Sequence, residues 1–94
     1  MESLLFSWNE TLMCWECPLL DEEIYMHRYP PSNSLCSNLI SITFMGTHAS
    51  YEIFDSLHEA QQYLYVKYNK EVKYRDPNEV EYVKHNKKGA GSII

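Results

Sequence analysis

Residues 39–68, LISITFMGTHASYEIFDSLHEAQQYLYVKY, decide the fold, because they carry signals for two strands and a helix in direct succession. The segment 39–44 is apolar and β-branched, MGTHAS is able to turn, and residues 51–54 alternate, which predicts a β-hairpin over 39–54. Ser56 and Glu59 have the spacing of a capping box. Apolar residues then recur at the spacing of one helical face: Leu57, Ala60, Leu64 and Tyr68. We therefore expect a helix over 56–69.

Toward the C-terminus the pattern supports one more strand and an ambiguous segment. Residues 71–75 (EVKYR) read as a short strand. Asp76 then suits a helix cap and Pro77 suits a first helical position, which favours a helix over 77–88. The β-formers in the same segment allow a hairpin instead, with Tyr74 opposite Tyr82. Residues 89–94 are expected to form a flexible tail.

The N-terminal third is less regular. Residues 1–28 are β-like, with one or two strands near 3–8 and 11–16 and a turn at Asn9-Glu10. Residues 29–38 (YPPSNSLCSN) read as a loop. The whole chain of 94 residues is expected to be a single small α+β domain. In it, hairpins pack against one main helix, and residues 39–88 form a ββαβ(α) core.

The charge is distributed unevenly along the chain, whose net charge is -5. Residues 1–60 hold nine acidic residues and only Arg28 as a base, whereas residues 61–94 hold seven bases and four acids. This favours a protein partner with a basic face. The Tyr/Lys-rich region 63–88 makes nucleic-acid binding an alternative, which the acidic total disfavours. With neither a signal peptide nor a membrane span in evidence, we expect a soluble cytoplasmic protein, monomeric or homodimeric.

The residue pattern indicates a binding protein rather than an enzyme. It shows no Ser/His/Asp order, phosphate loop or paired acids that would announce a catalytic set. Aromatic and apolar residues instead lie beside acids, as in the core and rim of an interface. The candidate partner-binding residues are Trp8, Leu12, Trp15, Glu16, Asp21, Glu22, Glu23, Tyr25 and Tyr29. By analogy, the chain would be an accessory or inhibitor protein, such as viruses and phages encode to block a host protein, in the host cytoplasm or nucleus.

The cysteine pair in CWEC offers an alternative in which zinc staples an interaction domain. Two cysteines at this spacing provide one side of a tetrahedral site, which would be completed by a histidine and a third cysteine. The candidate ligands are Cys14, Cys17, His27 and Cys36. Redox chemistry is disfavoured, because a proline follows the second cysteine and nearby acids raise a thiol pKa. Without zinc, no cofactor is expected, and reduced thiols are the default.

Residues 12–16 also resemble a short docking motif. Leu12, Cys14 and Glu16 match the L-x-C-x-E peptides by which many viral proteins engage the retinoblastoma-family pocket. Such peptides bind in an extended conformation, with an apolar residue and acids following. Leu19 and the acids at 21–23 stand in those places here. The resemblance implies a partner with apolar slots for the leucine and the cysteine.

A second resemblance spans a longer part of the chain. The order of Ser37-Asn38, Gly46, the segment SLHEAQQYLYVKY and Pro77 is similar to that in NADAR-type proteins, with His58-Glu59 in place of the family's Glu-His. That family is linked to N-glycosidase and ADP-ribose chemistry. The resemblance implies, as a further alternative, a truncated protein of this kind.

Overall fold

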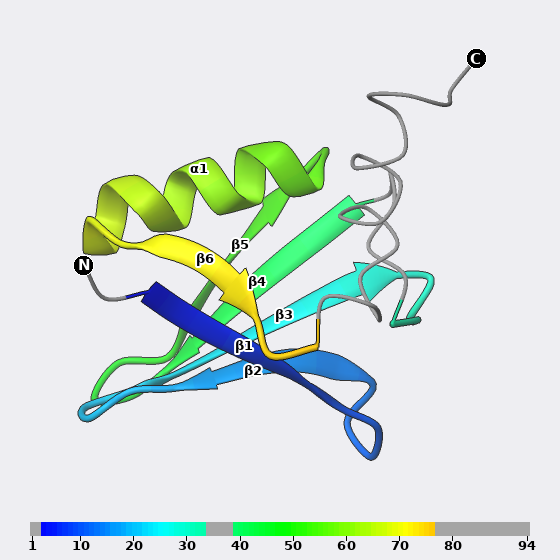
Figure 1. Cartoon of the computed structure of the whole chain (residues 1–94), viewed down its shortest axis with the longest axis horizontal. Coiled ribbons are helices and arrows are strands. Elements are labelled where there is room, and N and C mark those ends of the chain that lie inside the picture. Colours follow the sequence, from blue (N-terminus) through cyan, green and yellow to red (C-terminus); the bar gives the residue numbers. More distant parts are fainter. Residues whose placement is uncertain (1–2, 34–38, 77–94) are drawn as a thin grey trace.

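The computed structural model of the chain describes residues 3–33 and 39–76 and shows one sheet with one helix on it (Figure 1). The strands are β1 (Ser3–Asn9), β2 (Cys14–Pro18), β3 (Glu23–Tyr29), β4 (Leu39–Met45), β5 (Ser50–Phe54) and β6 (Glu71–Tyr74). The helix α1 (Leu57–Tyr68) lies between β5 and β6 in the chain. This confirms the expected α+β class, with hairpins packed against a main helix.

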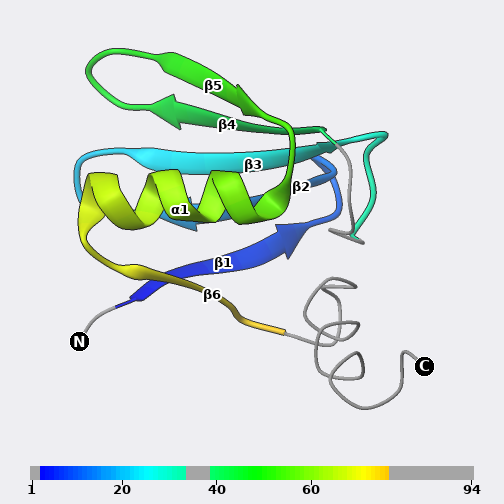
Figure 2. The same cartoon turned by 90° about the horizontal axis from the view of Figure 1, so that it is seen from above.

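The strands lie in the order β5-β4-β3-β2-β1-β6. The first five in the chain form successive antiparallel pairs, and β6 adds to β1 in parallel, with Leu4 opposite Val72 and Phe6 opposite Tyr74. Parallel strands cannot be joined by a tight turn and need a long crossover connection. Here the crossover is α1, which connects β5 at one margin of the sheet to β6 at the other. Figure 2 shows α1 over the middle of the sheet, with β5 and β6 at opposite margins.

The helix begins at the cap that its sequence predicts and ends at Asn69. The Oγ of Ser56 accepts a hydrogen bond of 3.2 Å from the Glu59 amide, which satisfies one of the free donors of the first turn. Asn69 closes the other end in the left-handed conformation, with φ of 56°, and its amide donates to the Tyr65 carbonyl at 2.7 Å. The helix expected over 56–69 is confirmed.

The core lies between α1 and the face of the sheet that α1 covers. Trp15 is its largest fully buried side chain. Its ring makes edge contacts with Trp8 and Tyr74, each with ring centroids 5.3 Å apart. Such edge-to-face pairs stabilise beyond the area that they bury. The other members of the buried cluster are Leu4, Phe6, Cys17, Ile24, Met26, Ile40, Ile42, Phe44, Leu57, Ala60 and Leu64.

Two features of the N-terminal third differ from the expectation. The strand β3 fills residues 23–29, whereas only strands near 3–8 and 11–16 were expected there. The β1–β2 hairpin also has a longer turn than Asn9-Glu10, because it extends to Met13, whose φ is 54°. The side chain of Asn9 holds this turn by accepting from the Leu12 amide at 3.0 Å.

Some expectations concern residues whose structure is not described. The second helix or hairpin over 77–88 and the tail over 89–94 lie outside the described residues. Within the described part, no helix is long and apolar enough to cross a membrane.

Candidate protein interface

The face of the sheet opposite α1, here called the open face, is unusually apolar. Side chains alternate between the two faces of each strand, so the open face carries the residues between the core positions. Six of the eleven exposed large apolar side chains of the described residues lie there: Leu5, Tyr29, Leu39, Met45, Tyr51 and Ile53. Antiparallel sheets with one solvated face normally present polar residues on it. A surface of this composition is typical of an interaction site.

Carboxylates and a tyrosine lie among these apolar residues. Glu16 is opposite Tyr25, Tyr25 is opposite Thr43 and Thr43 is opposite Tyr51, which makes one row across four strands. The Tyr25 hydroxyl donates a hydrogen bond to Glu23, and that bond is the main reason why the pKa of Tyr25 is raised to about 12. Tyr25 is neutral at physiological pH, as tyrosines ordinarily are, and its hydroxyl orients the Glu23 carboxylate on the open face.

The turn between β2 and β3 carries more acid beside this row. It is closed by a hydrogen bond of 2.8 Å from the Leu19 amide to the Glu22 carbonyl. The Tyr68 hydroxyl donates to the Glu22 carboxylate at 2.5 Å, so the turn is fastened to α1. A small hollow of about 220 Å³ lies next to it, lined by Leu19, Leu20, Asp21, Glu22, Glu23 and Met45. These two hydrogen bonds fix the position of the acidic turn on the surface.

The candidate partner-binding residues lie in three places. Glu16, Glu23, Tyr25 and Tyr29 lie on the open face, and Asp21 and Glu22 adjoin it in the turn. Leu12 is 51% exposed, in the β1–β2 turn. Trp8 and Trp15 point to the other face, where Trp8 is half-buried and Trp15 is fully buried.

The prediction that Trp15 binds a partner is therefore corrected, because its side chain is fully buried. The register of β2 sends Trp15 into the core together with Cys17, because residues two apart in a strand share a face. In contrast, the apolar residues Leu39, Met45, Tyr51 and Ile53 belong to the open face and were not among the candidates. The sequence did carry a signal for them, because apolar residues in 39–54 occupy both the odd and the even positions of the strands. That signal was used only to predict the hairpin.

The expected zinc ligands are not brought together in the part of the chain that the structure describes. Cys14 and Cys17 are three apart in β2, so their side chains point to opposite faces. His27 lies on the open face, where burial lowers its pKa, and Cys36 is outside the described residues. No group of three or more His, Cys, Asp or Glu side chains in the described ranges has metal-site geometry.

Both described thiols are protected from ionisation. Burial, with a smaller contribution from Glu16, raises the pKa of Cys14 to about 11. Burial also raises the pKa of Cys17. Since the thiolate is the reactive form, neither thiol is activated for redox or nucleophilic chemistry. The motif formed by Leu12, Cys14 and Glu16 is likewise folded into a hairpin, where Cys14 is 1% exposed and its side chain is not accessible to a partner.

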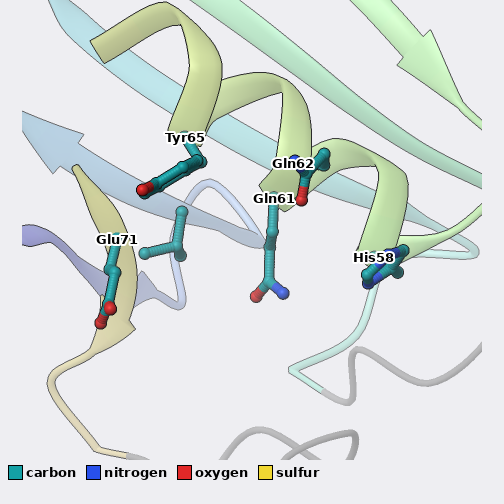
Figure 3. Close-up of a pocket in the computed structure, with 6 residues that line it drawn as sticks. His58, Gln61, Gln62, Tyr65 and Glu71 are labelled. Atoms are coloured by element: carbon teal, nitrogen blue, oxygen red, sulfur yellow. The ribbon is translucent and has the colours of Figure 1, made fainter. Parts of the chain in front are cut away.

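A polar hollow of about 280 Å³ lies between α1 and β6 (Figure 3). Gln61 extends into it from the helix, and His58 lies at the end away from Tyr65 and Glu71. The Oε1 of Gln61 accepts from the Tyr74 hydroxyl at 2.5 Å. The lining therefore offers amides, one imidazole and one carboxylate on an open surface, with Val72 as its apolar member.

The tyrosines of the expected nucleic-acid region are mostly engaged inside the fold. Tyr63 packs on Phe54 with ring centroids 5.2 Å apart, and Tyr68 bonds to Glu22. The ammonium of Lys67 lies 5.1 Å from the centre of the Phe44 ring, a cation–π contact that covers the core. Stacking of bases needs free ring faces, so this part of the chain offers few. Residues 77–88 of the same region lie beyond the described ranges.

Comparisons of the chain with protein-family models, with curated proteins and with solved structures find no match.

Proposed function

We propose that the chain is a protein-binding module that takes a partner with a basic, partly apolar surface on its open face. The observation that carries the proposal is the concentration of exposed large apolar side chains on that face. Burying such side chains against a partner is favourable by about 25 cal/mol per Å² of apolar area. Six of the eleven exposed large apolar side chains of the described residues lie on the open face.

The acidic residues on and beside the open face favour a positively charged partner. Glu16 and Glu23 lie on the open face, and Asp21 and Glu22 lie at its rim. Carboxylates at a rim steer a basic partner and disfavour an acidic one. The module would act by occupying its partner's surface, which is how accessory and inhibitor proteins of this size work.

The test compares two open-face variants with a matched control on α1. Met45→Lys and Glu23→Lys change residues that are paired across β3 and β4. Tyr65→Lys places the same charge on the helix, at a side chain of similar exposure (43%, against 46% for Met45). All three proteins are immobilised and exposed to lysate, and the captured proteins are quantified by mass spectrometry. Circular dichroism verifies that each variant is folded.

We expect both open-face variants to lose, by about tenfold or more, the proteins that the parent and Tyr65→Lys retain. Retention by the parent should also weaken as salt is raised, because charge contributes. If Met45→Lys and Glu23→Lys capture the same proteins as the parent, the open face is not the interface.

A further inference from the structure

A groove lies on the α1 side of the sheet, opposite the open face, between α1 and the margin strand β5. Its volume is about 570 Å³, and it is lined by Phe54, His58, Glu59, Gln62, Tyr63 and Val66. Phe54 and Tyr63 form an aromatic floor, with ring centroids 5.2 Å apart. Val66 is 73% exposed at the groove's end, although it is apolar. The groove is thus an open depression beside a strand, with an aromatic floor and three polar lining residues, His58, Glu59 and Gln62.

Among the described residues, the strand that borders this groove has no neighbour on its outer side. β5 is last in the strand order, and its residues 50–53 are all exposed. An edge strand presents a row of backbone donors and acceptors, and proteins usually protect it with lysine, proline or a bulge. β5 (SYEIF) contains no lysine and no proline, whereas β6 at the opposite margin carries Lys73. Glu52 is the one charged residue of β5, whereas β6 has Glu71 and Lys73, so β5 is the less protected of the two margins.

Three carboxylates lie around this edge, against one cation, Lys67, which lies over the Phe44 ring near the Ser50 end of β5. Glu52 is opposite Ile42, a core residue, so its side chain lies on the α1 side of β5 and yet is exposed. Asp55 follows the strand, and Glu59 lines the groove. No lysine or arginine is among the lining residues. Antiparallel pairing of two copies centred on β5 would place their two Glu52 side chains opposite each other, and like charges directly opposite in a sheet are destabilising.

We propose that β5 is completed by an extended peptide of apolar–basic–apolar pattern, which pairs with its free edge and fills the groove beside α1. The backbone of the peptide would supply the hydrogen bonds, and alternate side chains would supply specificity. A basic residue lies opposite Glu52, and β-branched residues lie opposite Tyr51 and Ile53. An apolar residue next to Phe54 enters the groove toward Val66.

The inference rests on the proposed function in one respect, that the chain binds protein ligands, and it assigns them a second surface. That surface consists of the β5 edge and the groove on the α1 side of the sheet. It shares Tyr51 and Ile53 with the open face, but Val66 belongs to the groove alone, and Met45 and Glu23 belong to the open face alone. Variants of the two surfaces therefore test the two statements separately.

The probe is the peptide acetyl-Thr-Leu-Val-Lys-Val-Thr-amide, titrated into isotope-labelled protein and followed by NMR. We expect saturable shifts in the backbone amides of residues 50–54 and of the groove side of α1. A peptide with glutamate in place of lysine should bind about tenfold more weakly or not at all. Two peptides N-methylated at alternate amides provide a further test. The peptide that loses the backbone donors facing β5 should not bind, whereas the peptide methylated at the outward-facing amides should bind normally.

Val66→Lys is the matching change in the protein, since it puts a like charge and a longer chain into the groove at an exposed position. It should weaken binding of the peptide by about tenfold. Tyr65→Lys, on the β6 side of the same helix, should leave peptide binding unchanged. Met45→Lys should also leave peptide binding intact, because it changes the open face only.

Three results would overturn the proposal. One is the absence of shifts at millimolar peptide, and another is shifts confined to the open face. The third is a concentration-dependent dimer, formed through β5 without peptide, which would make a second copy the occupant. None of these bears on capture by the open face, so failure here and failure of the proposed function are distinguishable.

Discussion

The hydroxyl of Tyr68, in the last turn of α1, donates a hydrogen bond of 2.5 Å to the Glu22 carboxylate in the turn between β2 and β3. The two residues are 46 positions apart in the chain. Burial and this hydrogen bond raise the pKa of Tyr68. The acidic turn beside the open face is therefore positioned by the helix on the opposite side of the sheet.

Removing this hydroxyl should loosen the turn and lower stability. We expect Tyr68→Phe to reduce the free energy of unfolding by about 1–2 kcal/mol, as for a partly buried bond to a charged group. Urea unfolding followed by circular dichroism measures the change. Tyr65→Phe is the control and should change little, because Tyr65 is 43% exposed. Equal effects of the two changes would show that the Tyr68 bond does not hold the turn.

Gly46 supports the same turn from the β4–β5 connection. A Cβ at this position would lie 2.8 Å from the Cβ of Glu22 and 3.1 Å from the carbonyl oxygen of Asp21. These are not the ends of flexible side chains, so the backbone must shift. We expect Gly46→Ala to cost about 1–3 kcal/mol, as other overpacking substitutions do. Thermal unfolding measures it, and Thr47→Ala, at the exposed neighbour, should leave the melting temperature nearly unchanged. A melting temperature that is unaffected by Gly46→Ala would mean that the turn is not packed against the connection.

The sequence predicted those elements whose signals are local. The hairpin of β4 and β5 alternates or is β-branched throughout, and α1 has a cap, one apolar face and a terminating Asn69. The strand β3 (EIYMHRY) was not predicted, because its charged residues and His27 mask the buried positions Ile24 and Met26. Its strand conformation depends on β2 and β4 on either side of it, and that is a tertiary effect.

The candidate surface was predicted in part, for a related reason. The acids Glu16 and Glu23 and the tyrosines Tyr25 and Tyr29 were found from composition and do lie together. The position of Trp15 in the core could not be found that way, because one residue of register decides between core and surface. The groove beside β5 depends on which strand ends the sheet, and this follows from the crossover through α1 and not from any local pattern.

The cap of α1 gives a local test of the helix. Replacing Ser56 by alanine removes the acceptor for the Glu59 amide, and we expect a loss of about 1 kcal/mol in the free energy of unfolding. Ser56→Asp should retain most of the stability, because aspartate also caps well and suits the positive end of the helix dipole. Urea unfolding measures both variants. If alanine and aspartate were equally destabilising, the side chain would not be acting as a cap.

Zinc should not stabilise the protein through Cys14 and Cys17. Their side chains lie on opposite faces of β2, so a metal cannot contact both without a change of the strand. We expect the melting temperature to be the same with a chelator and with one equivalent of zinc. Cys14→Ala should shift it equally in both conditions. Cys36→Ser serves as a control for metal held elsewhere in the chain. A rise with zinc that Cys14→Ala abolishes would contradict the arrangement described here.

The buried thiol of Cys14 predicts a loss of stability at alkaline pH. Its pKa is raised from 9.0 to about 11 in the folded protein, so the folded state holds this proton more tightly than the unfolded state does. The corresponding stability is complete below about pH 9 and is lost as the pH rises to about 11. The raised pKa of Tyr68 acts with the same sign at higher pH. We therefore expect the urea midpoint to be constant from pH 7 to 8 and to fall between about pH 9 and 11. Cys14→Ala should make that fall shallower, and a midpoint of the parent protein that stays constant to pH 11 would show that Cys14 ionises normally.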